Sequence, residues 1–138
     1  MKHVFLILLL SCSTVTLISC QSQNEGMTLV ENVSDISISK STAYGSLNEN
    51  FFSSFSQEEI ITDFEKILNN SKGTTIDVMK ETPTYDILVR YENGDTHGLH
   101  LLLENEGEES ILMFIGYEDG YIVSSEDTRK LKNIIDAK

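Results

Sequence analysis

The histidines and a run of glutamates are the side chains whose spacing could bind a metal ion. His97 and His100 lie three residues apart in a segment that alternates like a β-strand, where positions three apart point to opposite faces. They therefore cannot converge on one ion, as metal ligands must. The stretch from Glu104 to Glu109 could attract calcium, but it lacks the ligand spacing and closing glutamate of an EF-hand loop. We expect no metal site and no cofactor.

The sequence also contains few features that would indicate catalysis. The chain contains no G-x-S-x-G nucleophile elbow and no glycine-rich phosphate-binding loop. Asp86 and His100 could form a general base and the group that orients it. Charged pairs of this kind at a protein surface are usually structural. The sequence therefore predicts no catalytic residues.

The N-terminus has the pattern of a secretory leader. A positively charged start, Met1-Lys2-His3, precedes an apolar stretch from Val4 to Ile18. This stretch is too short and too rich in hydroxyl side chains for a membrane span, which needs about 20 apolar residues.

The leader ends in Leu17-Ile18-Ser19-Cys20, which resembles the lipobox of bacterial lipoproteins. The resemblance implies transfer of diacylglycerol to the Cys20 sulfur and cleavage between Ser19 and Cys20. Cysteine is required because, among small neutral side chains, only a thiolate is nucleophilic enough to form the thioether. Two acyl chains would then anchor the protein stably to a membrane.

Three regions follow from these motifs. We predict a signal peptide at 1–19, a lipidated cysteine with a polar tether at 20–31, and one domain at 32–138. The protein is expected on the outer, extracytoplasmic face of the cell membrane, held by its N-terminal lipid. Cys12 would leave with the leader, so the mature chain could form no internal disulfide.

The predicted mature chain is strongly acidic. All 22 acidic residues follow position 19, whereas one of the 10 basic residues, Lys2, precedes it, leaving a formal charge of −13. Nucleic-acid binding requires clustered Lys and Arg to neutralise phosphates, so it is disfavoured. The same charge would repel an anionic membrane surface, so membrane attachment must come from the lipid.

The elements that would position these residues form an α+β pattern. Strands are predicted over 33–39, 51–55, 85–91, 99–103, 110–117 and 121–123. One helix should follow Ser56, with Ser56 as N-cap and Glu59 completing a capping box, and another should begin at about Ser125. The order predicts an antiparallel β-sheet with two helices packed on one face.

The turn after Tyr91 fixes the register of the central hairpin. A two-residue Asn93-Gly94 turn would pair Ile87 with His100 and scatter the apolar residues over both faces. A three-residue loop with Gly94 left-handed pairs Tyr91 with Asp95 and gathers them on one face. We therefore expect the pairs Val89 with His97, Ile87 with Leu99, and Tyr85 with Leu101.

This register predicts both the core and an open face of the sheet. The expected core comprises Phe64, Ile67, Ile87, Val89, Leu99, Leu101, Ile115 and Ile134. The opposite face would carry Asp86, Leu88, Arg90, His100 and Leu102, with exposed leucines among charges. Such a patch suggests a partner, and Arg is a frequent interface anchor, so these five residues are the candidate contact face. Isolated surface leucines are also normal, and another strand or the tether could cover them.

Several segments together resemble the YhfM-like family of small Bacillus-type lipoproteins. They are Ile36 to Lys40, Asn50-Phe51-Phe52, Tyr85 to Val89 with the Gly94 turn, Gly98 to Leu101, and Tyr121 to Leu131. None of them is a catalytic signature. The resemblance supports the location and a compact domain, and it implies no functional residue except the lipobox cysteine.

Three functions are consistent with these features. The sequence favours a non-enzymatic binding or accessory domain that contacts an envelope protein. The alternative is a small-ligand sensor or carrier, which would need an apolar pocket between helices and sheet. An enzyme ranks last.

Overall fold

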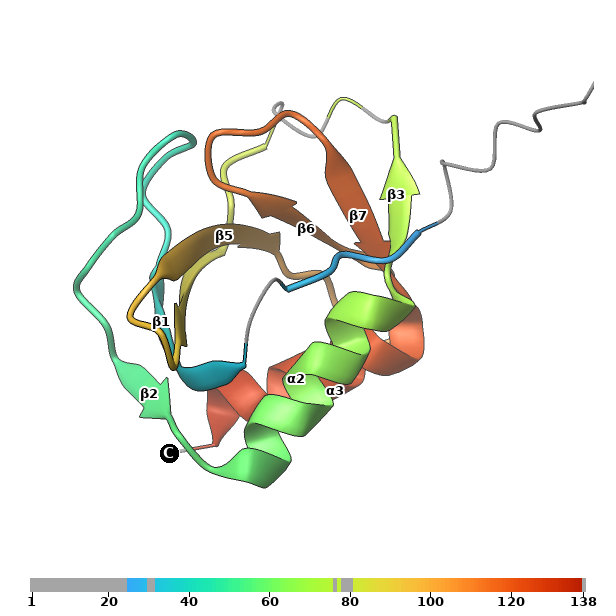
Figure 1. The fold of residues 1–138 in the computed structure, drawn as a ribbon. Helices are drawn as coiled ribbons and strands as arrows, with labels where there is room; N and C mark the ends of the chain where they lie inside the picture. The colour runs from blue at the N-terminus through green and yellow to red at the C-terminus, as the bar shows by residue number, and fades with distance from the viewer. Residues whose placement is uncertain (1–24, 30–31, 76, 78–80, 138) are drawn as a thin grey trace, which may run out of the picture.

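In a computed structural model, the described residues form a curved antiparallel sheet with two helices (Figure 1). The structure describes residues 25–29, 32–75, 77 and 81–137. The leader and Cys20 lie outside the described residues. Within the described part, no helix is long and apolar enough to cross a membrane.

The sheet of the described residues has seven strands in the order β2-β1-β4-β5-β6-β7-β3. They are β1 (Val33–Lys40), β2 (Ser53–Phe55), β3 (Lys72–Thr74), β4 (Tyr85–Tyr91), β5 (Thr96–Leu102), β6 (Ser110–Phe114) and β7 (Gly120–Val123). The helices are α2 (Glu58–Asn70) and α3 (Ser125–Asp136), which contact each other. The predicted antiparallel sheet with two helices is thus confirmed, while β3 was missed.

The predicted register of the central hairpin is confirmed. Ile87 pairs with Leu99, Val89 with His97 and Tyr85 with Leu101. The Tyr91 N–H donates to the Asp95 carbonyl at 2.9 Å, and Gly94 has a φ of +92°. This left-handed conformation favours glycine, because a Cβ would clash with the backbone there.

The start of the first helix differs from the prediction. Gln57 is the N-cap of α2 and makes no side-chain capping bond, so the capping box at Ser56 and Glu59 is wrong. Ser56 stands one residue too early, because a capping hydroxyl must reach the second or third amide of the helix. In α3, by contrast, the Ser124 hydroxyl accepts from the Asp127 amide at 3.2 Å.

The core contains one set of alternating strand residues together with residues of both helices. Six of the eight predicted core residues are buried, and Ile134 is half-buried but packs against the core. Ile115 was predicted wrongly. It follows the last residue of β6, is half-buried, and lies against Gly98 instead, where an added Cβ would meet its Cδ1 at 2.9 Å.

The part of the predicted tether that the structure describes, residues 25–29, packs on the end of α2 (Figure 1). Met27 is fully buried, and its N–H donates to the Leu68 carbonyl at 3.0 Å. Gly26 approaches the helix so closely that an added Cβ would lie 2.0 Å from the Asn69 oxygen. We call residues 25–29 the N-terminal strap.

Candidate functional site

Asp86 and His100 form a buried pair, not the surface pair that the sequence suggested. The Nδ1 atom of His100 lies 2.8 Å from Asp86 Oδ1, and both residues are at most 1% exposed. The second carboxylate oxygen of Asp86 accepts from the Asn48 amide at 2.7 Å. Both partners therefore have hydrogen bonds inside the protein.

The remaining ring nitrogen of His100 is also occupied. The Gly45 amide donates to Nε2 at 3.2 Å, so Nε2 is an acceptor and the proton of a neutral ring resides on Nδ1, facing Asp86. A general base needs an accessible lone pair within reach of a substrate. In this structure the pair holds a loop in place and is not open to a substrate.

That loop, residues 41–50 between β1 and β2, covers the sheet over the pair. Tyr44 contacts the His100 ring edge-on at 5.4 Å between centroids, and the Ser39 hydroxyl donates to the Asn48 carbonyl. Burial, and then the negative charges of Glu81 and Asp77, raise the pKa of Tyr44 above its ordinary value of 10.0. The phenol therefore stays neutral at physiological pH.

The candidate contact face is consequently not an exposed patch. Four of its five residues, Asp86, Leu88, His100 and Leu102, are buried. Arg90 is half-buried and donates to Asp35 at 2.8 Å and to Ser37 at 3.2 Å. The inference from exposed leucines was wrong, because Leu88 and Leu102 are buried. Loop 41–50 covers the same face at Asp86 and His100, which alternation alone assigns to solvent.

The two histidines do point to opposite faces, as predicted. The Nδ1 atom of His97 lies 2.7 Å from the Tyr91 hydroxyl, and its ring meets Phe114 edge-on at 5.6 Å. Phe114 in turn contacts Tyr117 at 6.1 Å and Tyr121 at 6.4 Å between centroids. These five residues form a continuous aromatic row that leads toward the β6–β7 hairpin.

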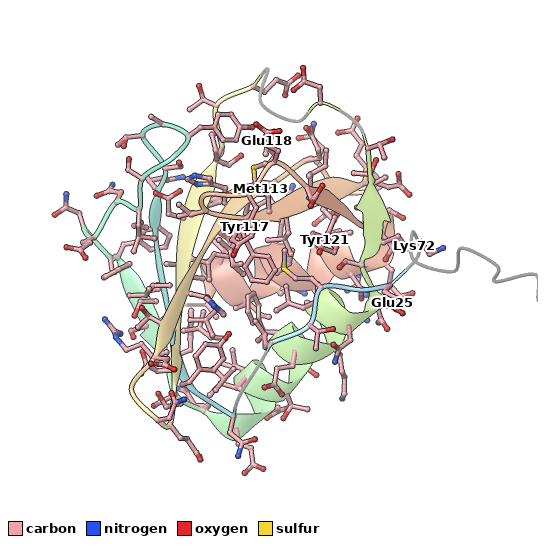
Figure 2. All side chains as sticks on the ribbon, turned by 45° about the horizontal axis from the view of Figure 1, so that its top comes forward. Glu25, Lys72, Met113, Tyr117, Glu118 and Tyr121 are labelled. Atoms are coloured by element: carbon pink, nitrogen blue, oxygen red, sulfur yellow. The ribbon has the colours of Figure 1, made fainter. Side chains whose placement is uncertain are left out.

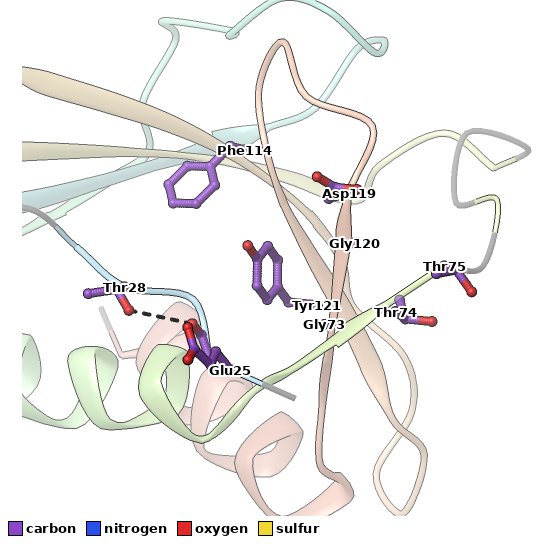
Figure 3. Close-up of a pocket in the computed structure, with 10 residues that line it drawn as sticks. Glu25, Thr28, Gly73, Thr74, Thr75, Phe114, Asp119, Gly120 and Tyr121 are labelled. Carbon is purple, nitrogen blue, oxygen red and sulfur yellow. Dashed lines mark hydrogen bonds between the residues drawn. The ribbon is translucent and has the colours of Figure 1, made fainter. Parts of the chain in front are cut away.

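The aromatic row ends at a cavity of about 680 Å³ between the N-terminal strap, β3 and β7 (Figure 3). Its lining consists of Glu25, Gly26, Thr28, Gly73, Thr74, Thr75, Phe114, Asp119, Gly120 and Tyr121. We call it the strap cavity. The volume lies in the range of small-molecule sites.

The strap cavity combines an apolar wall with polar groups. Figure 3 shows the Phe114 and Tyr121 rings facing the interior, with Glu25 and Thr28 on one side and Asp119 on the other. In Figure 2, Tyr117 and Tyr121 come from the β6–β7 hairpin and Glu25 from the strap. No part of this lining was predicted, because residues 25–29 were expected to belong to a polar tether and no strand was predicted at β3.

A second cavity, of about 950 Å³, lies between β2 and the end of α3. Its cation, Lys40, already donates to the Tyr85 hydroxyl at 2.9 Å and lies 4.2 Å from the centre of that ring. Ser37 and Lys40 have the S-x-x-K spacing of some serine hydrolases. On a strand, however, positions three apart point to opposite faces, and Ser37 contacts the Ser54 hydroxyl. The strap cavity is therefore the better candidate site.

Two comparisons place the chain among known proteins. A model of the YhfM protein family matches residues 30–138, which confirms the resemblance seen in the sequence. No curated protein matches the chain.

The structure is similar to the crystal structure of a thioesterase-like protein from Clostridium sporogenes. The two have 21% sequence identity and a TM-score of 0.62, over 79% of this chain and 98% of the other. The likeness shows a shared fold, of the hotdog type. It overturns the expectation of a non-enzymatic binding or accessory domain, and the ranking of an enzyme last, because a thioesterase-like protein has this fold.

Proposed function

We propose that this member of the YhfM family hydrolyses small acyl thioesters or esters in the strap cavity, since it shares its fold with a thioesterase-like protein. The observation that carries this proposal is the lining of the cavity. Carboxylates, hydroxyls and close-packed glycine backbone surround the same space as two aromatic rings.

Each part of the lining has a role in such a reaction. The Phe114 and Tyr121 rings pack against the acyl chain, since they form the apolar wall. The Glu25 carboxylate, on the cavity side beside Thr28 in Figure 3, acts as general base. The Tyr121 hydroxyl supplies a hydrogen bond to the developing oxyanion.

The reaction then balances without a cofactor. Glu25 takes a proton from water as the water oxygen attacks the carbonyl carbon. The tetrahedral intermediate collapses with breakage of the C–S bond, and the proton returns to the leaving sulfur. The products are a carboxylic acid and a thiol, or an alcohol when the substrate is an ester.

Replacement of the proposed base tests this function. Glu25→Gln keeps the shape of the side chain but removes its basicity, so we expect kcat for a butyryl thioester to fall by about 100-fold or more. Asp119→Asn should have a smaller effect, because its carboxylate lies across the cavity. The rate is measured by the release of free thiol from the purified domain.

Glu118→Gln is the matched control, since Glu118 precedes Asp119 in the chain but does not line the cavity. It should retain the parent rate. A parent protein that releases thiol no faster than buffer, across short and long acyl chains, would show that the domain is not such a hydrolase.

The place of action is the outer face of the cell membrane, with the chain held by lipid on Cys20. The leader and lipobox support this location. They also limit the distance between the lipid and the cavity, because Glu25 is five positions after Cys20, and five residue steps span at most about 18 Å when extended. The strap cavity would thus work close to the membrane surface.

Cys20→Ala is expected to abolish lipidation, because no other residue near the cleavage point offers a thiol. The variant should remain uncleaved or be released. Intact-mass measurement of membrane-purified protein should show the added diacylglycerol on the parent only. A parent protein with a mature N-terminus elsewhere and no lipid mass would contradict the anchor.

The proposal also includes the arrangement of the layers. We propose that both helices cover the same face of the sheet, the one from which Tyr121 reaches the strap cavity. The composition of the core supports this, because residues of α2 and α3 share one cluster with the alternating positions that include Ile87 and Leu112.

A further inference from the structure

We infer that the strap cavity selects acyl compounds that carry a positive charge, such as a quaternary ammonium group, over those that carry phosphates. The acyl part of this inference rests on the proposed function, whereas the preference for a cation rests on the cavity itself. Three features of the lining support it: its charges, its aromatic rings, and the absence of Arg, Lys and helix N-termini among the described lining residues.

The charged side chains that line the cavity are all acidic. They are Glu25 and Asp119, and no Lys, Arg or His is among the described lining residues. Lys72 is adjacent to Gly73, but it is exposed and is not among the residues that line the cavity. Two carboxylates around one space attract a cation, and they repel an anion that enters it.

The aromatic wall favours the same kind of ligand. Phe114 and Tyr121 lie edge to face, with an interplanar angle of 87°, so their rings present different orientations to the cavity. Tyr117 extends this row and is 67% exposed. The faces of such rings attract quaternary ammonium groups, which cannot form the N–H hydrogen bonds that other cations use.

A coenzyme A thioester is the substrate that this lining disfavours. Proteins hold phosphates with Arg and Lys or with the amides at a helix N-terminus. Neither helix supplies such a site here. The first turns of α2 and α3 carry acidic residues, and neither turn lines the cavity.

Three thioesters with the same acyl group test the preference. Butyrylthiocholine carries a positive charge, the N-acetylcysteamine thioester of butyrate is neutral, and butyryl-coenzyme A is a polyanion. We expect kcat/KM to fall in that order, by about tenfold at each step, which corresponds to about 1.4 kcal/mol. Added salt should lower kcat/KM for butyrylthiocholine and not for the neutral thioester.

Binding of tetramethylammonium, measured by calorimetry, separates this inference from the proposed function. Tyr121→Leu should weaken it by about fivefold through loss of the ring face, whereas Glu118→Gln should not change it. Binding without hydrolysis of any thioester would support the cation site and contradict the hydrolase. Fastest hydrolysis of butyryl-coenzyme A, or no binding of tetramethylammonium, would overturn the preference.

Discussion

Asp86→Ala is expected to lower the free energy of unfolding by about 3–5 kcal/mol, as does removal of one partner from a buried polar pair. The Asp86 side chain is fully buried and accepts from both His100 Nδ1 and the Asn48 amide. Truncation leaves both donors without an acceptor in a space that water does not reach. Loop 41–50 would then lose its attachment to the sheet.

Urea unfolding followed by circular dichroism measures this loss. Glu92→Ala is the control, because Glu92 is an exposed acidic residue just beyond the same strand, and it should change stability by less than about 0.5 kcal/mol. The loss of unfolding free energy in the double variant, Asp86→Ala with His100→Ala, should be smaller than the sum of the losses in the two single variants, by about 1–3 kcal/mol. Equal midpoints for Asp86→Ala and its parent would mean that the pair does not hold the loop.

The burial of Asp86 could not be predicted from the alternation of apolar and polar residues. Alternation assigns a residue to one of two faces, and it says nothing about what covers that face. The covering segment here, 41–50, is polar and has no apolar period, so it looked like an ordinary connection. Its attachment depends on the amides of Gly45 and Asn48, and every residue but proline has such an amide.

The central hairpin, by contrast, could be predicted from local chemistry. Only one loop length placed Ile87, Val89, Leu99 and Leu101 on the same face, and it required glycine at position 94. The register therefore followed from two independent constraints that agree. The helices were predictable for the same reason, since their apolar residues recur at helical spacing.

The strap cavity depends on contacts that have no local signal. Met27 is buried through contacts with α2, about 40 residues away in the chain, yet the segment before it, Gln21 to Glu25, is polar. Strand β3 has three residues and includes Gly73, so it has no alternation to detect. The one available signal was Gly26-Met27-Thr28-Leu29-Val30, where three apolar residues interrupt an otherwise polar tether.

Phe64→Ala is expected to cost about 3–5 kcal/mol, because Phe64 is 1% exposed and the void it leaves is surrounded by packed side chains. Phe64 lies in α2 and belongs to the core shared with the strands and α3. Phe52→Ala is the matched control, since it removes the same atoms from a ring that is 45% exposed, and it should cost less than about 1 kcal/mol. The difference between the two urea midpoints isolates the contribution of burial. Equal midpoints would mean that α2 does not pack on the sheet through Phe64, and the core described above would then be wrong.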